Sequence, residues 1–172
     1  MSHDYDPAWD YPCIDIESVD DIPPYEWESV LHAADHVKRV LAPAMGFQEG
    51  IEIFFVEPYG LTGASAEHSV VAIYCNGTSS RPAIGFDITA MKEICDEEDL
   101  DLVHQFHVSA AHELAHAYQE AAGLDSDHEH GFDEDDAEVF GRLWADERAI
   151  DLTILNPLAQ DATQSRAPSR GT

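Results

Sequence analysis

The stretch "LDLVHQFHVSAAHELAHAYQEAAGL" (residues 100–124) carries the longest regular apolar pattern in the chain. Three- and four-residue steps between apolar residues place their side chains on one face of a helix, and no proline or glycine interrupts the pattern. The apolar residues at this spacing are Leu100, Leu102, Val103, Phe106, Ala110, Leu114 and Ala117. Gly123 fits the left-handed position that follows a helix. We therefore expect one helix of several turns that ends before this glycine.

Two histidines lie within the predicted helix, in the segment "HELAH" (residues 112–116). At about 100° per residue, His112 and His116 differ by only about 40° and stand one turn apart, so both imidazoles can reach one ion. Glu113 flanks the same face and can address a water molecule bound to that ion. The alternative is a solvated helix face with two unrelated histidines. The small apolar residues around the motif favour the metal site, because polar groups among apolar ones need a partner.

A catalytic tetrahedral zinc site needs a third protein ligand and one open position for water. A third histidine directly downstream is absent, because Gln119 stands where the glycine of that longer pattern would fall and Ala122 where its histidine would fall. A cysteine loop of the Glu-Gly-Cys-Leu-Ser kind is also absent, since neither Cys75 nor Cys95 lies in such a sequence. The third ligand is therefore expected to be a glutamate on a second helix.

The segment "DEDDAEVFGRLWADERAI" (residues 133–150) predicts that second helix, with Asp133 as its N-cap and an acidic first turn at the positive end of the helix dipole. Phe140 and Trp144 share one face and would anchor the helix in the core. An adjacent stripe, within about 60°, begins with two carboxylates and continues with two small residues that permit close packing. Its members are Glu134, Glu138, Gly141 and Ala145. This pattern suits Glu134 as the metal ligand and Glu138 as an acceptor that orients a ligating histidine.

"HELAH" followed by "EDDAEVFG" (residues 134–141) resembles the gluzincin metallopeptidases, in which HExxH precedes a helix with Glu-x-x-Ala-Asp/Glu/Asn-x-Phe-Ala/Gly. The pattern is similar to small single-domain forms, including the ImmA/IrrE-like peptidases and the minimal gluzincins, and less similar to thermolysin. The resemblance covers roughly residues 82–145. It implies a zincin-like α+β fold and one Zn²⁺ per chain. The implied ligands are His112, His116 and Glu134, with Glu113 as the general base and Glu138 behind a ligand histidine.

Upstream of the motif, the sequence predicts an N-terminal helix and a small mixed β-sheet. The segment 25–47 predicts an amphipathic helix that ends at Pro43. Its apolar positions are Trp27, Val30, Leu31, Ala34, Val37 and Leu41. Strands are expected in "IEIFFVEPYG" (51–60), "SVVAIYC" (69–75) and "PAIGFDI" (82–88), because β-branched and aromatic runs end at turn residues. The resemblance implies that the last strand edges the sheet and pairs with the substrate backbone.

Length and composition predict one strongly acidic domain. A chain of 172 residues suits a single domain, here residues 23–156, with polar segments at 1–22 and 157–172 expected to be disordered. The 35 acidic and 8 basic residues give a formal net charge of −27, which opposes binding to nucleic acid and favours basic peptides or a salt-rich environment. No secretory signal or membrane-length apolar run is apparent, so we expect a cytoplasmic protein without membrane contact. Three cysteines without a CxxC spacing indicate no disulfide framework.

These features favour a zinc metallopeptidase of the endopeptidase type. Zinc would lower the pKa of its bound water and polarise the scissile carbonyl, while Glu113 would take the water proton and deliver it to the leaving amine. Tyr118 is expected to point away from the ion. His128 and His130 could overhang the cleft and hold the oxyanion, although solvated loop histidines are the simpler interpretation.

Two other functions stay open. The protein could be a regulatory or pseudo-peptidase that mainly binds a partner such as a repressor, or an acidic protein with a structural metal only. A structural site would need a fourth ligand, and none lies at an obvious spacing. The acidic segment "DSDHEHGFDEDD" (125–136) does not fit an EF-hand, because His130 occupies the obligatory glycine position. His104 and His107 point about 80° and 140° away from His112, so they are expected to be packing or surface residues.

Overall fold

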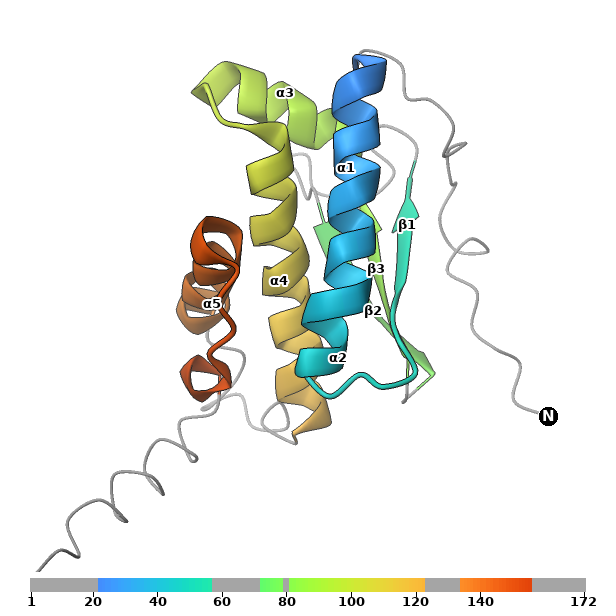
Figure 1. Cartoon of the computed structure of the whole chain (residues 1–172), viewed down its shortest axis with the longest axis vertical. Coiled ribbons are helices and arrows are strands. Elements are labelled where there is room, and N and C mark those ends of the chain that lie inside the picture. The colour runs from blue at the N-terminus through green and yellow to red at the C-terminus, as the bar shows by residue number, and fades with distance from the viewer. Residues whose placement is uncertain (1–21, 57–71, 79–80, 123–133, 156–172) are drawn as a thin grey trace, which may run out of the picture.

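The described part of the chain is mostly helical, with a long central helix between a small sheet and a C-terminal helix (Figure 1). The computed structural model describes residues 22–56, 72–78, 81–122 and 134–155. In chain order the elements are α1 (Pro24–His36), the π-helical turn η2 (Val37–Leu41), α2 (Ala42–Ala44), β1 (Glu52–Phe55), β2 (Ala72–Thr78), β3 (Arg81–Phe86), α3 (Ile88–Glu98), α4 (Leu102–Ala121), α5 (Glu134–Glu147) and the 3₁₀ turn η3 (Leu152–Ile154). The α+β class predicted from the sequence is confirmed.

The first helix runs from Pro24 to Ala44 without interruption, as α1, η2 and α2. Most of its predicted apolar face is buried, namely Trp27, Val30, Ala34, Val37 and Leu41. The helix ends at Ala44, one residue after Pro43 and close to the predicted end. The turn before the proline widens, and the Ala42 amide donates to the carbonyl of Val37, five residues back. A wider turn relieves the contact that a proline ring makes with the carbonyl four residues earlier.

The sheet has the strand order β1-β3-β2, with β1 parallel and β2 antiparallel to β3. The prediction that residues 82–88 form an edge strand is therefore wrong, because β3 is the central strand. Its residues 82–86 are all buried, and its backbone pairs with β1 along one edge and with β2 along the other. Gly85 pairs with Phe54 on β1, and a Cβ at this glycine would collide with the phenylalanine ring. The β1–β3 pairing thus depends on the absence of a side chain there.

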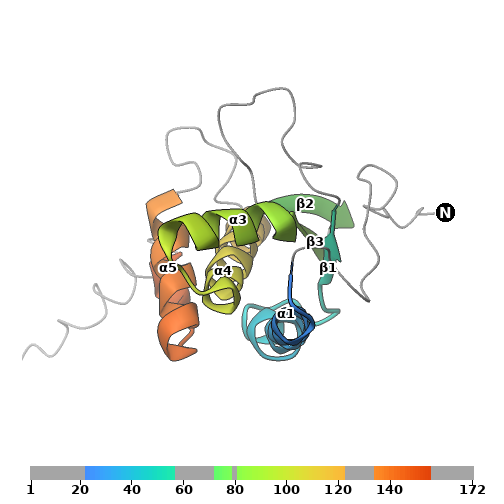
Figure 2. The same cartoon turned by 90° about the horizontal axis from the view of Figure 1, so that it is seen from above.

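The helix predicted within residues 100–124 is α4, and a further helix, α3, precedes it where the sequence analysis placed no helix. Asp87 caps α3 by accepting a hydrogen bond from the Ala90 amide at 3.0 Å. Asp99 then takes a left-handed conformation, with φ of 55°, and Asp101 caps α4. Leu100, which the sequence analysis placed on the helical face, lies between the two helices and is 45% exposed. Figure 2 shows α3 lying across the first turns of α4.

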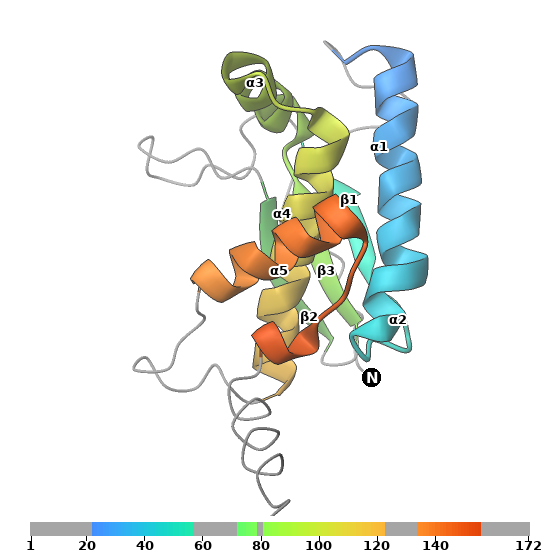
Figure 3. The same ribbon diagram turned by 60° about the vertical axis from the view of Figure 1, so that its left-hand side comes forward.

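The core surrounds α4. Phe106 of this helix packs on Phe86 of β3 with ring centroids 4.5 Å apart, and Phe55 of β1 lies 6.3 Å from Phe106. On the other side of α4, Phe140 and Trp144 of α5 are fully buried, as their shared face predicts. Figure 3 shows α5 crossing α4 at a steep angle. The central helix is thus fixed by a sheet on one side and a helix on the other.

Several predictions fall on residues outside those described. They include the helix ends at Gly123 and Asp133, the loop histidines His128 and His130, and the terminal segments apart from Ile22, which is buried in the core. Within the described residues, no helix combines the length and apolar character needed to cross a membrane.

Candidate metal centre

Two histidines of α4 and one glutamate of α5 converge at a single point. The Nε2 atom of His112 lies 2.9 Å from Oε2 of Glu134, and Nε2 of His116 lies 3.1 Å from Oε1 of the same carboxylate. One donor atom from each residue lies within 4.8 Å of the other two. A tetrahedral ion with bonds of about 2.1 Å separates its donor atoms by about 3.4 Å. The arrangement therefore fits a metal ion, and it is the only such group of three or more donors among the described residues.

The close approach of α5 to α4 places Glu134 over the two histidines. A Cβ at Gly141 would lie 2.6 Å from the Val108 carbonyl oxygen and 3.4 Å from the His112 amide nitrogen. The backbone of α5 therefore lies directly against the α4 turn that carries the first histidine. Ala145, one turn further along, is also buried. Gly141 of the predicted stripe forms this contact, and the two carboxylates of the stripe lie beside the histidines of the motif.

Glu138 lies behind His112. The Nδ1 atom of the imidazole is 3.2 Å from Oε2 of Glu138, and the other carboxylate oxygen accepts from Nε of Arg142 at 2.9 Å. With an ion bound at Nε2, the ring proton would lie on Nδ1, where the Glu138 carboxylate can accept it. The orienting position that the sequence suggested for Glu138 is thus compatible with the geometry.

Burial favours the neutral form of the His116 imidazole. Its ring is buried on α4, and this burial lowers its pKa below the usual value. The positive charge of a protonated His112 would lower the pKa further, whereas the negative charge of Glu134 opposes the shift. Metal ions bind the neutral imidazole, so a lowered pKa keeps this residue in its ligating form at neutral pH. By contrast, the Glu134 side chain is 71% exposed and gives the site an open side.

A cleft opens beside His112, the one residue of the three donors that lines it. It has a volume of about 220 Å³ and lies between α4, the start of β2 and α5. Its lining residues are Ala72, Gln105, Val108, Ser109, His112, Glu113 and Glu138. Glu113 is half-buried and therefore faces a space that can hold water or a ligand next to the donor atoms. The sequence analysis did not identify Gln105 or Ser109, although both precede the motif on the same helical face by one or two turns.

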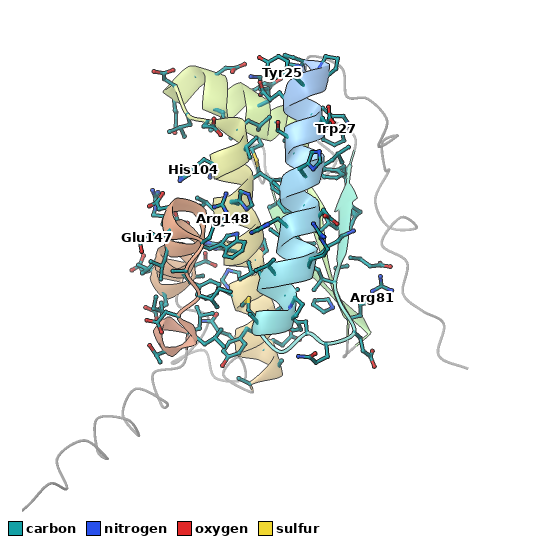
Figure 4. All side chains as sticks on the ribbon, viewed as in Figure 1. Tyr25, Trp27, Arg81, His104, Glu147 and Arg148 are labelled. Atoms are coloured by element: carbon teal, nitrogen blue, oxygen red, sulfur yellow. The ribbon has the colours of Figure 1, made fainter. Side chains whose placement is uncertain are left out.

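The remaining described histidines of α4 lie away from the donors, as their directions predict. His104 contacts Asp146 of α5, with Nε2 and Oδ1 2.6 Å apart. His107 is buried and accepts a hydrogen bond from Trp144 Nε1 at 3.1 Å, and burial lowers its pKa to about 4. Arg148 lies over the tryptophan, 5.5 Å from the ring centre. Figure 4 shows His104 beside the upper turns of α4 and Arg148 between α4 and α5.

Tyr118 also lies away from the donor group. It contacts the core and lines a separate cleft together with residues of the α2–β1 connection, including Met45 and Phe47. This placement agrees with the direction expected from helix geometry. It removes Tyr118 from the candidates for stabilising an oxyanion.

Comparison with known proteins adds no relative. The chain matches no protein-family model, and neither characterised proteins nor solved structures give a match. The candidate metal centre therefore rests on its own geometry, in which His112, His116 and Glu134 meet beside a cleft.

Proposed function

We propose that this protein is a zinc-dependent metallopeptidase with a zincin-like fold, in which a metal-activated water hydrolyses a peptide bond. The observation that carries the proposal is the convergence of His112, His116 and Glu134 beside the cleft that contains Glu113. Three protein donors leave one position of a tetrahedral ion for water, which is the difference between a catalytic and a structural zinc site. Two imidazoles and one carboxylate form a donor set that zinc hydrolases use.

A zinc ion at this place would supply an activated water and polarise the substrate carbonyl. Glu113 would then take a proton from the water and pass it to the leaving amine, because it follows a ligand residue directly and lines the same cleft. Glu138 would keep His112 in the orientation and tautomer that directs Nε2 toward the ion. Each of these roles requires only the side chain already present at that place.

The substrate is proposed to be a peptide that enters along β2. This strand pairs with β3 on one side only within the described residues, and its first residue, Ala72, lines the cleft. An extended peptide can add to such an edge through backbone hydrogen bonds. The role first expected for residues 82–88 is thus proposed for the neighbouring strand β2. The net charge of −27 would increase the encounter rate of basic peptides.

The proposal is tested by separating metal binding from turnover. The purified full chain should contain zinc close to one ion per molecule and cleave members of a quenched fluorescent peptide library that includes basic sequences. Glu113→Gln should keep the zinc and lose the hydrolysis, whereas Glu134→Ala should lose most of the zinc. Glu97→Gln makes the same chemical change on the exposed face of α3 and serves as the matched control.

Two outcomes would overturn the assignment. Unchanged zinc content in Glu134→Ala would remove the third ligand, and wild-type hydrolysis rates in Glu113→Gln would remove the general base. Stoichiometric zinc without hydrolysis of any library peptide would instead support the partner-binding or structural-metal function. In that case, equal capture of a basic protein by the wild type and Glu113→Gln would identify partner binding.

A further inference from the structure

Gln119 is a buried polar residue one turn after the motif. The residue is 4% exposed, and its neighbours Ala115 and Ala117 on α4 are apolar and also buried. A buried amide needs hydrogen-bond partners, because an unsatisfied one costs about 1–3 kcal/mol. The buried amide of Gln119 therefore needs a hydrogen-bond partner within the fold.

His116 is the neighbour that can act as this hydrogen-bond partner. Residues three apart on a helix lie on the same side, and helical side chains lean toward the N-terminus, so Gln119 reaches back over the preceding turn. The two side chains lie close enough to interact. Oε1 of Gln119 is buried and accepts no hydrogen bond from the described residues, so it is available to a ring N–H of the imidazole.

The Nε2 atom of His116 faces the other two donor residues and not Gln119. It lies 3.1 Å from Oε1 of Glu134, on the side where the three donors converge. The ring atom left for the amide is Nδ1. Both Nδ1 of His116 and Oε1 of Gln119 are shielded from solvent, so water cannot take the place of either.

We propose that Gln119 is a positioning residue of the metal centre, with its Oε1 accepting the Nδ1–H of His116 when Nε2 ligates the ion. The inference rests on the proposed function, because it assigns a partner to one ligand of that site. Neutral imidazole carries one ring proton, so an acceptor at Nδ1 leaves the lone pair on Nε2. The two histidines are then oriented from different elements, His112 by Glu138 of α5 and His116 by a residue of α4 itself.

The test measures zinc affinity in the full chain by competition with a chelator. Gln119→Leu keeps a side chain of similar size without an acceptor, and Gln119→Glu keeps an oxygen in the same place. We expect zinc binding to weaken 10–100-fold in the first variant and to return to within a few-fold of wild type in the second. Gln48→Leu is the matched control, because Gln48 is exposed in the α2–β1 connection and its loss should leave zinc affinity unchanged.

Two further readouts keep a structural role distinct. A purely structural glutamine would lower the stability of the metal-free chain without a selective loss of zinc affinity, and glutamate would not restore it. Nitrogen-15 NMR of the zinc-loaded wild type should find His116 protonated at Nδ1 and metal-bound at Nε2, a result that needs no variant to fold. Wild-type affinity in Gln119→Leu, or zinc on Nδ1, would overturn the inference while leaving the proposed function in place. A wild type that does not bind zinc would remove both.

Discussion

The contact at Gly141 provides the most direct test of how α5 is placed. Replacement by alanine would put a methyl group 2.6 Å from the Val108 carbonyl oxygen. Carbon–oxygen contacts in proteins are about 3.3 Å or longer, so the two helices would have to separate by about 0.7 Å. Overpacking of this kind costs about 1–3 kcal/mol, and the higher helix propensity of alanine returns up to about 1 kcal/mol. We therefore expect Gly141→Ala to lose about 0–3 kcal/mol of stability without metal.

The larger effect should fall on the metal. Glu134 belongs to the same helix as Gly141, so a shift of about 0.7 Å exceeds the roughly 0.2 Å tolerance of metal–ligand distances. Zinc affinity should therefore fall by at least tenfold, which chelator competition would measure beside urea unfolding of the metal-free chain. Val139→Ala, on the exposed face of α5, should leave zinc affinity unchanged. Wild-type zinc affinity together with increased stability in Gly141→Ala would refute the close approach of the two helices.

Two further predictions concern the cleft and a buried histidine. Ser109→Phe should fill much of the cleft beside Glu113 and reduce peptide hydrolysis at least tenfold while zinc content stays at the wild-type level; hydrolysis at the wild-type rate would place the substrate elsewhere. The folded-state pKa of His107 is about 4, below its value of about 6.5 in the unfolded chain. Between these pH values the unfolded chain therefore binds more protons than the folded chain. The free energy of unfolding should fall by up to about 3 kcal/mol as the pH drops from about 6.5 toward 4. His107→Gln can still accept from Trp144 and does not titrate, so urea unfolding across this range should show a smaller pH dependence; an unchanged dependence would exclude His107 as its source.

The sequence predicts best what depends on neighbouring residues along one helix. The helical direction of His112 and His116 follows from their spacing, and so does the stripe on α5 that meets them. The acidic helix α3 was missed because only Ile88, Ala90, Met91 and Cys95 face the core within its eleven residues. Its end was also hidden, because an aspartate, Asp99, takes the left-handed conformation that a glycine usually marks.

The errors and omissions arise where distant segments decide the outcome. The order of strands in a sheet depends on pairings between segments far apart in the chain, so the central position of β3 has no local signature. The hydrogen bond between His107 and Trp144 joins residues 37 positions apart and is equally invisible in the local pattern. The cleft residue Ser109, in contrast, lies on the motif face of α4 and could have been identified by extending the helical projection by one turn.

The division of donors between two helices has a consequence for the stability of the protein. Two donor atoms belong to α4 and the third to α5, so an ion at this point would cross-link the two helices. Free zinc at one hundred times its dissociation constant would add about 2.7 kcal/mol to the free energy of unfolding, because the unfolded chain does not assemble the site. Chelation of the ion would remove that contribution, and the α4–α5 interface would be the first part of the fold to lose stability. The thermal stability of the protein would then report the zinc concentration around it.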